Sequence, residues 1–277
     1  MIVNTTLELS QSSAEVTLLN DGSYIITWRS SVDGGYFGNR GDVYLQKFDI
    51  DGNKIGDEVL VNTQQNGSQS NIEITSLTDG NYAVTWQTNR YVDSQGWERD
   101  IYSQKFDIDG NKLGEETLVN TYTEDTQNMQ KIISLDDGGY VITWQSSGQD
   151  DIDGAPGVYL QKFDASGEKV GVETLVNTYT EGSQADPEIT SLPDGKYVIT
   201  WGSSDQDGSQ GGIFTQIFNP DGTKFEVGAT NTAPTVEAIG EIQVNTYSES
   251  NQSYQQITSL SDGGFVVTWV GARNDRS

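Results

Sequence analysis

The sequence predicts an all-β protein, a β-propeller-like ring of four-stranded antiparallel blades, and three observations support this prediction. The 277 residues include 31 glycines and only 34% hydrophobic residues, which suits many short strands joined by Gly-rich turns. A segment of the form DGxYxxTW occurs four times along the chain and a fifth time with Phe in place of Tyr, and a segment of the form QxFxxxG recurs four times. Each segment is typical of a β-hairpin, and two hairpins within about 58 residues make one blade.

The repeat is best aligned on the tripeptide VNT, whose valine is the origin of each copy. In all five copies Gln stands eight residues after this valine, Asp eighteen and Trp twenty-five. Regular spacing of this kind predicts a single repeat domain spanning 1–277, with a fifth copy that is incomplete. The repeats lie at approximately 3–60, 61–118, 119–175, 176–243 and 244–277.

The strand that ends in each repeated Trp is apolar on both faces, as in YVITW at 197–201. A strand of this kind is buried on both faces, as inner strands of a propeller are by the neighbouring blades. We therefore expect Trp86, Trp144 and Trp201 to be core residues. The Asn of VNT and the Gln at the eighth position are expected to bond backbone groups between repeats, because buried amides must be satisfied.

The fourth repeat carries an insertion near 229–241, with Pro234 after a polar Asn-Thr pair. This composition indicates an interdomain joint. Two arrangements remain open. In the favoured one the chain forms a five-bladed ring, or a fragment of a larger one, and the last blade shares strands with the N-terminal segment. In the other, a four-blade unit ends near residue 228 and a new array begins.

Composition excludes several classes of partner. Fifteen Lys and Arg face 41 Asp and Glu, a formal net charge of −26, which disfavours nucleic acid and anionic membranes. Cys and His are absent, so no disulfide, cysteine or histidine zinc site or histidine base is available. No apolar run reaches the roughly 18 residues of a membrane span, so membrane insertion is not expected.

The repeat at 137–178, DGGYVITWQSS through VETLVNT, resembles repeats of very large secreted bacterial proteins, the RTX-type, type-I-secreted adhesins and calcium-binding surface proteins. NTAPTV at 231–236 resembles the opening of cadherin-like or immunoglobulin-like modules in such chains. The resemblance implies an extracellular or cell-surface location, adjoining domains in a larger chain, and calcium. The glycine-rich calcium-binding nonapeptide of that family is absent from this sequence.

Two loops between the hairpins are acidic enough to suggest calcium, which prefers several oxygen ligands close together. The same letters also make ordinary Asp-Gly turns, so both interpretations remain open. The candidate ligands are Asp150, Asp151 and Asp153 in the third repeat and Asp205 and Asp207 in the fourth.

A second set of carboxylates stands twelve residues after the origin, on the presumed innermost strand. Carboxylates around a central channel could serve as acid and base in glycoside hydrolysis. Because the copies stay alike, whereas an enzyme site breaks repeat symmetry, the sequence favours a solvated channel lining or cation site. The row consists of Glu15, Glu73, Lys131, Glu188 and Gln256.

Aromatic residues in the variable loops, Tyr36, Phe37, Tyr91 and Trp97, could stack on sugar rings or contact a protein, because loops on one face commonly carry function. The sequence thus predicts a non-enzymatic adhesin or spacer module that binds a glycan or protein on a cell surface and is stabilised by calcium. The alternative is a carboxylate-dependent, glycosidase-like enzyme.

Overall fold

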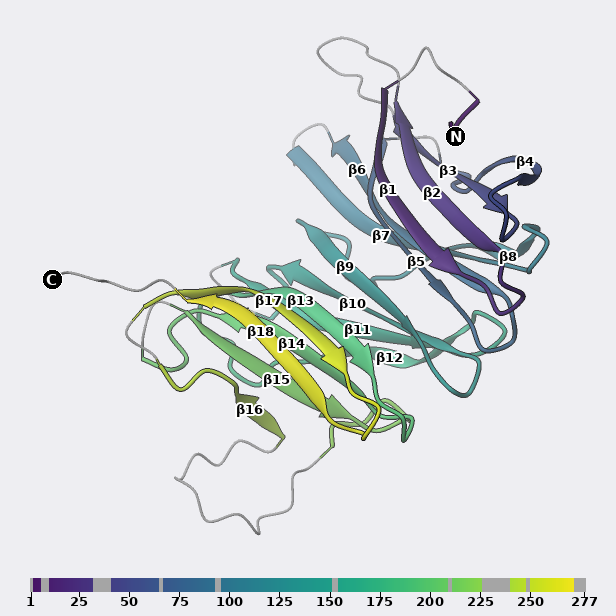
Figure 1. Ribbon diagram of the computed structural model, residues 1–277. Coiled ribbons are helices and arrows are strands. Elements are labelled where there is room, and N and C mark those ends of the chain that lie inside the picture. Colours follow the sequence, from purple (N-terminus) through teal and green to yellow (C-terminus); the bar gives the residue numbers. More distant parts are fainter. Residues whose placement is uncertain are drawn as a thin grey trace, which may run out of the picture. The chain divides into compact units, whose positions relative to one another are not determined.

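The computed structural model describes residues 2–5, 10–31, 41–64, 67–92, 96–150, 154–208, 211–225, 240–247 and 250–271. Within these ranges the chain forms eighteen strands and no helix (Figure 1). Accordingly, none of these residues belongs to a helix with the length and hydrophobicity of a membrane span. The predicted all-β class is confirmed.

The strands form four sheets of four strands and one sheet of two strands, each ordered as in the chain. The first sheet contains β1 (Ser10–Leu18), β2 (Tyr24–Ser31), β3 (Gly41–Phe48) and β4 (Lys54–Leu60). The second contains β5 (Ser68–Ser76), β6 (Tyr82–Val92), β7 (Gly96–Phe106) and β8 (Lys112–Leu118).

The third sheet contains β9 (Gln127–Ser134), β10 (Tyr140–Ser147), β11 (Pro156–Phe163) and β12 (Lys169–Leu175). The fourth contains β13 (Gln184–Ser191), β14 (Tyr197–Ser203), β15 (Gly212–Phe218) and β16 (Glu241–Gln243). The fifth contains only β17 (Gln252–Ser259) and β18 (Phe265–Gly271). Four-stranded antiparallel sheets of this kind are the predicted blades.

The chain divides into two compact units, and the division passes through the third sheet. The first unit comprises Met1–Ile142 and Phe163–Gly171, and the second comprises Thr143–Lys162 and Val172–Ser277. Strands β1 to β9 lie in the first unit, and β13 to β18 lie in the second. Each unit is described by itself below.

The Asp-Gly turn of each first hairpin follows from its sequence. In the first repeat the backbone N–H of Gly22 donates to Leu19 O at 3.0 Å, and Leu19 N–H donates to Ser23 O at 2.8 Å. Gly22 has a φ of 82°, which is costly for residues with a Cβ. The same two bonds recur at Leu77, Leu135, Leu192 and Leu260.

Residues 226–239, which hold most of the insertion, lie outside the described residues, but the strands on either side of them pair in one sheet, which does not support an interdomain joint. After the turn that follows β15, the chain returns as β16, whose Glu241 pairs with Gln216 and whose Gln243 pairs with Phe214. Strand β16 therefore supplies the fourth strand of the same sheet and leads directly into the fifth VNT. The alternative in which a four-blade unit ends near residue 228 does not fit this pairing.

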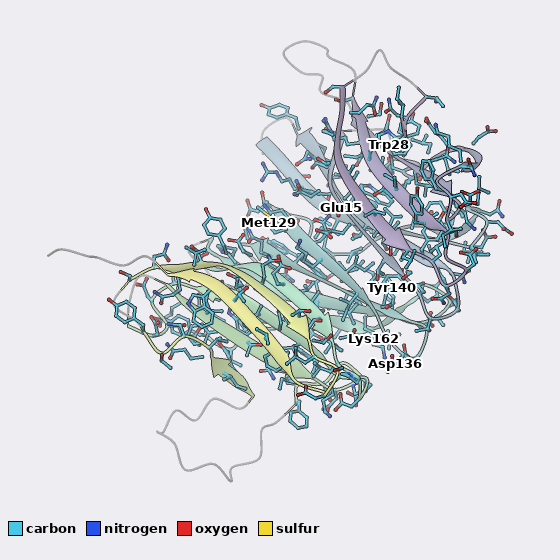
Figure 2. The ribbon with its side chains drawn as sticks, viewed as in Figure 1. Glu15, Trp28, Met129, Asp136, Tyr140 and Lys162 are labelled. Atoms are coloured by element: carbon cyan, nitrogen blue, oxygen red, sulfur yellow. The ribbon has the colours of Figure 1, made fainter. Side chains whose placement is uncertain are left out.

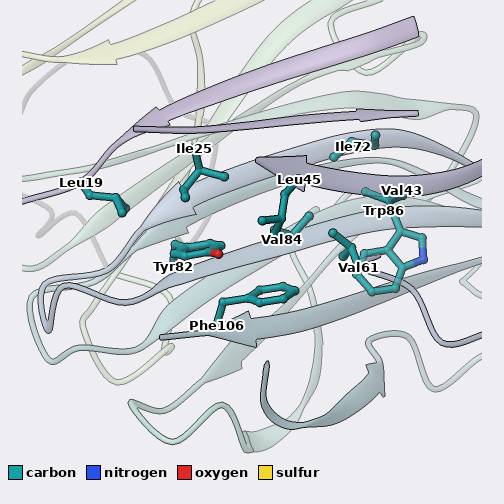
Figure 3. Packing of buried hydrophobic residues seen from close by; sticks show 10 residues of the cluster. All are labelled: Leu19, Ile25, Val43, Leu45, Val61, Ile72, Tyr82, Val84, Trp86 and Phe106. Atoms are coloured by element: carbon teal, nitrogen blue, oxygen red, sulfur yellow. The ribbon is translucent and has the colours of Figure 1, made fainter. Parts of the chain in front are cut away.

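The core is built from the repeated aromatic and β-branched residues. Trp86, Trp144 and Trp201 have an exposed fraction of 0%, which confirms the prediction that they are core residues. Around Trp86 the side chains of neighbouring sheets in the first unit form one cluster (Figure 3). Its members are Leu19, Ile25, Val43, Leu45, Val61, Ile72, Tyr82, Val84 and Phe106.

The repeated Asn bonds backbone groups between repeats, as predicted, whereas the repeated Gln bonds backbone within its own repeat, which differs from the prediction. Asn62 of the second VNT accepts a hydrogen bond from Val43 N–H at 2.8 Å and donates to Asp42 Oδ1 at 2.8 Å. Gln127 is fully buried and donates to Glu124 O at 2.9 Å. The Asn bond joins one repeat to the one before it, whereas the Gln bond closes its own loop. Asn120, Asn177 and Asn245 repeat the pattern of Asn62.

Acid is expected to destabilise the fold through the aspartates of its turns. The Asn53 amide holds the pKa of Asp49 below its ordinary value of 3.8, and the Ser166 hydroxyl holds the pKa of Asp164 below that value. A carboxyl with a lowered folded-state pKa stabilises the folded state above its unfolded-state pKa, and this contribution is lost as pH falls through the folded value. We expect Tm to fall below about pH 4.

Thermal unfolding followed by circular dichroism between pH 3 and pH 6 measures this loss. Asp164→Asn keeps an acceptor oxygen in the turn but cannot titrate, so the variant should lose less Tm on acidification than the unmodified chain. Because these carboxylates are partly exposed, each effect is small and the variants should add nearly independently. A Tm that stays flat down to pH 3 would show that the turn aspartates contribute nothing.

Candidate functional site: the carboxylates of the first strands

The residues twelve positions after the valine of each VNT tripeptide lie on the first strands of their sheets. They are Glu15, Glu73, Lys131, Glu188 and Gln256. In the first unit β1 packs beside β5, and β5 packs beside β9. Lys131 Nζ on β9 lies 2.8 Å from Glu73 Oε1 on β5. In the second unit Gln256 on β17 donates to Glu188 Oε1 on β13 at 2.9 Å. Side chains that the sequence placed in one row therefore contact one another within each unit.

The backbone just before this row has an unusual conformation in every copy. A non-glycine residue ten positions after the VNT valine adopts a left-handed conformation in all five copies. In the first, second, fourth and fifth copies a β-bulge shifts the register at the same point, for example between Ser70 and Glu73. Strain of this kind is found mainly at functional sites, and bulges redirect the side chains that follow them. The five left-handed residues are Ser13, Asn71, Met129, Asp186 and Tyr254, with φ between 48° and 57°.

No pattern in the sequence indicates these bulges, because none of the five positions is a glycine. Side-chain hydrogen bonds hold two of these left-handed residues in place. Asn71 Nδ2 donates to Gln87 Oε1 at 2.9 Å, and the N–H of Asp186 donates to Gln145 Oε1 at 3.0 Å. Figure 2 labels Glu15 on β1 and Met129 on β9. Met129 is one of the five left-handed residues.

The two carboxylates of the first unit lie in different electrostatic environments. Partial removal from water raises the pKa of Glu15, the negative charge of Glu73 raises it further, and the positive charge of Lys131 opposes both. Glu73 itself is ion-paired with Lys131. Two carboxyl groups with different surroundings are the arrangement that acid–base chemistry on a glycosidic bond uses.

A long hairpin in the second sheet carries two of the predicted ligand-binding aromatics. Strands β6 and β7 pair along eleven residues each, and Tyr91 stands directly opposite Trp97 near the tip. The Tyr91 side chain is 54% exposed. Arg90 braces the hairpin through contacts with Glu98 at 2.9 Å and Asp100 at 3.1 Å. The predicted Tyr36 and Phe37, and the side chain of Trp97, lie outside the described part of the chain.

The predicted calcium ligands that the structure describes have structural partners. Asp150 Oδ2 accepts a hydrogen bond from Asn177 Nδ2 at 3.3 Å, and Asp207 Oδ2 accepts one from Asn245 Nδ2 at 3.2 Å. These bonds repeat the one between Asn62 and Asp42. Asp205 forms a turn through its carbonyl, which accepts from Gly208 N–H.

Across the described ranges, no three Asp or Glu side chains gather as a metal site would require. Asp151 and Asp153 lie outside these ranges, and calcium at this loop stays a prediction. Millimolar calcium should then raise Tm by mass action, which amounts to about 2.7 kcal/mol at a hundred times the Kd. Asp151→Asn should blunt the rise. Equal stabilisation by sodium at the same ionic strength would instead indicate general screening.

Comparison with known structures supports the fold. A protein of unknown function from Dyadobacter fermentans superposes with a TM-score of 0.61 at 10% identity, covering 97% of this chain and 77% of that one. The GH93 α-L-arabinofuranosidase of Fusarium graminearum, solved with arabinobiose, gives 0.57 at 13% identity, covering 96% and 77%. The Penicillium chrysogenum α-L-arabinanase with arabinobiose gives 0.54 at 15%, covering 93% and 74%.

The last two structures are propeller-fold glycoside hydrolases, and the predicted propeller fold is thereby confirmed. No protein-family model matches the chain, and no curated protein matches it significantly. The prediction of a non-enzymatic adhesin or spacer module is contradicted, because the named structures that share this fold are glycoside hydrolases. The prediction rested on the Gln, Asp and Trp positions, which are identical in all five copies. It assumed the same symmetry for the residues twelve positions after the VNT valine. That row actually differs in charge from copy to copy.

Proposed function

We propose that this chain is a glycoside hydrolase that cleaves arabinose-containing glycans with two carboxylates on its first strands. The observation that carries the proposal is the pair of Glu15 and Glu73, whose charges interact across adjacent strands while Lys131 binds one of them. The arabinobiose bound to two proteins of the same fold supports the substrate class.

In the proposed reaction Glu15 is the general acid. Its raised pKa keeps the carboxyl protonated at a higher pH than an ordinary glutamate, so that it can donate a proton to the departing glycosidic oxygen. Glu73 acts as the carboxylate that either activates water or attacks the anomeric carbon, the two routes open to such a pair. Lys131 positions Glu73 through their 2.8 Å contact.

The hairpin tip of β6 and β7 is the proposed glycan-binding element of the same unit. Tyr91 and Trp97 stand opposite each other in register, and the apolar faces of sugars pack on aromatic rings. The ion pairs of Arg90 with Glu98 and Asp100 stiffen the strands beneath them. This element supplies binding, whereas the first-strand carboxylates supply the chemistry.

Incubation with arabinobiose and with linear arabinan, followed by chromatography of the products, tests the proposal. We expect arabinose or short arabinosides to appear in proportion to protein concentration. Xylan and cellulose oligosaccharides serve as substrates with other sugar rings and should be cleaved more slowly. A preparation that binds these glycans but returns all of them unchanged would overturn the proposed function.

A further inference from the structure

Two polar contacts join the first strands β5 and β9 of the first unit beside the proposed site. Lys131 Nζ lies 2.8 Å from Glu73 Oε1, and the side-chain amide of Gln130 donates to the backbone carbonyl of Asn71. Gln130 and Lys131 are consecutive residues of β9, and Asn71 precedes Glu73 by two residues in β5. The two strands are therefore tied to each other on both sides of the Glu73 backbone.

Asn71 is also held from the strand that follows it. It has the left-handed φ of 48°, and its side chain donates to Gln87 Oε1 of β6 at 2.9 Å. Gln87 is buried and donates in turn to Asn89, whose amide donates to Ser70 Oγ at 2.7 Å. Because the register shifts between Ser70 and Glu73, the conformation of Asn71 sets the direction in which the Glu73 side chain leaves β5.

The sequence carries this feature in some copies and not in others. Eleven and twelve residues after the VNT valine, the third copy has Gln130 and Lys131, and the fifth copy has Gln255 and Gln256. The copies with Glu at the twelfth position have Ala14, Ile72 and Pro187 at the eleventh. Glutamine at the eleventh position thus accompanies a hydrogen-bond donor at the twelfth, which a requirement common to all repeats would not produce.

Strands β13 and β17 of the second unit are joined in the same way. The side-chain amide of Gln255 donates to the carbonyl of Asp186, and Gln256 donates to Glu188 Oε1 at 2.9 Å. Gln255 is as deeply buried as Gln130. Because the proposed reaction uses carboxylates of the first unit, Gln255 is a matched control for the loss of the bond itself.

We propose that Gln130 is a positioning residue, which acts through Asn71 to hold Glu73 against Lys131. The consequence for catalysis rests on the proposed function, in which Glu73 is one of the two reacting carboxylates. Gln130 is 1% exposed, so it acts through these neighbours and not on the sugar. Small displacements of a reacting group cost much of its rate contribution, because the bound geometry must stay close to that of attack.

Kinetics with arabinobiose compares Gln130→Met with Gln255→Met. Methionine has a similar length and cannot donate, and Gln130 Oε1 has no partner among the described residues, so the change also removes an unpaired buried oxygen. We expect kcat of Gln130→Met to fall about tenfold with KM nearly unchanged, and Gln255→Met to keep full kcat. Unchanged kcat in Gln130→Met, or equal losses in the two variants, would overturn the proposal.

A second measurement does not depend on activity. NMR titration of the Glu15 carboxyl carbon reports the pKa of this group, which the charge of Lys131 lowers and that of Glu73 raises. Loss of the Gln130 bond frees β9, and Lys131 with it, to move away, so the pKa of Glu15 should rise in Gln130→Met and stay in place in Gln255→Met. An unchanged pKa in Gln130→Met would overturn the positioning role. The shift without any cleavage by the unmodified chain would overturn the proposed function alone.

Two variants of Asn71 test the same contact from β5 if Gln130→Met fails to fold. Glycine adopts the left-handed conformation freely and keeps the carbonyl that Gln130 bonds, whereas alanine disfavours this conformation. Asn71→Ala should therefore lower kcat more than Asn71→Gly does, and should shift the pKa of Glu15 more. Equal effects of the two variants on kcat and on this pKa would overturn the proposal, because the conformation of Asn71 would then not position Glu73.

Discussion

Glu15→Gln should lower kcat for arabinobiose about 10²- to 10⁴-fold, the range that a positioned general acid contributes. The amide keeps the size and polarity of the side chain but cannot donate the catalytic proton, so KM should change little. Glu73→Gln should lower kcat at least as much, because it removes the carboxylate that activates water or attacks the sugar. Glu115→Gln, at an exposed carboxylate of β8, is the matched control and should retain full activity.

The pH profile distinguishes a catalytic role of Glu15 from a structural one. Activity that requires protonated Glu15 falls as pH rises through the pKa of this group. Lys131 lowers that pKa, so Lys131→Met should move the alkaline limb of the profile to higher pH. Any residual activity of Glu73→Gln should move it the other way, since Glu73 raises the pKa of Glu15. An alkaline limb that does not move in either variant would remove Glu15 from the mechanism.

Trp144→Ala should lower the free energy of unfolding by roughly 3–5 kcal/mol, the usual loss for a large aromatic residue in a packed core. Trp144 has an exposed fraction of 0% and stacks on Tyr159, with ring centroids 6.4 Å apart. The alanine variant leaves a cavity lined by neighbours that cannot collapse into it. Urea unfolding followed by far-UV circular dichroism measures the loss.

Two variants control this result. Trp144→Phe keeps most of the ring and removes an indole N–H for which the described residues offer no partner, so its cost should be well below that of alanine. Trp269→Ala makes the same change at the equivalent, 39% exposed position and should cost less than half as much. Equal losses at Trp144 and Trp269 would contradict the assignment of the Trp row to the core.

Local signals in the sequence predicted the hairpins and their core. The Asp-Gly turns follow from glycine at positive φ, and the doubly apolar strands before Trp144 and Trp201 indicate burial on both faces. The repeated Asn could also be interpreted correctly as an amide that bonds backbone of the preceding repeat, because its spacing is constant. These features depend on contacts within one or two repeats, and comparing the five copies with one another makes their pattern visible.

Other features depend on contacts that the spacing does not reveal. The insertion looked like a joint because Pro234 and its polar neighbours resemble a linker, yet β16 returns to pair with β15. The bulge before Glu73 has no glycine to mark it, since Asn71 takes the left-handed conformation. The difference in charge between copies lies at one position per repeat, twelve residues after the VNT valine, whereas the Gln, Asp and Trp positions around it are the same in every copy.

The most direct test of the central claim follows arabinobiose by NMR in the presence of the unmodified chain and of Glu15→Gln. The proposed mechanism predicts that free arabinose signals grow with the unmodified chain and stay near the uncatalysed level with the variant, while both proteins give saturation-transfer contacts to the sugar. Saturation transfer from both proteins with no arabinose released by either, or equal release by both, would contradict catalysis by the first-strand carboxylates.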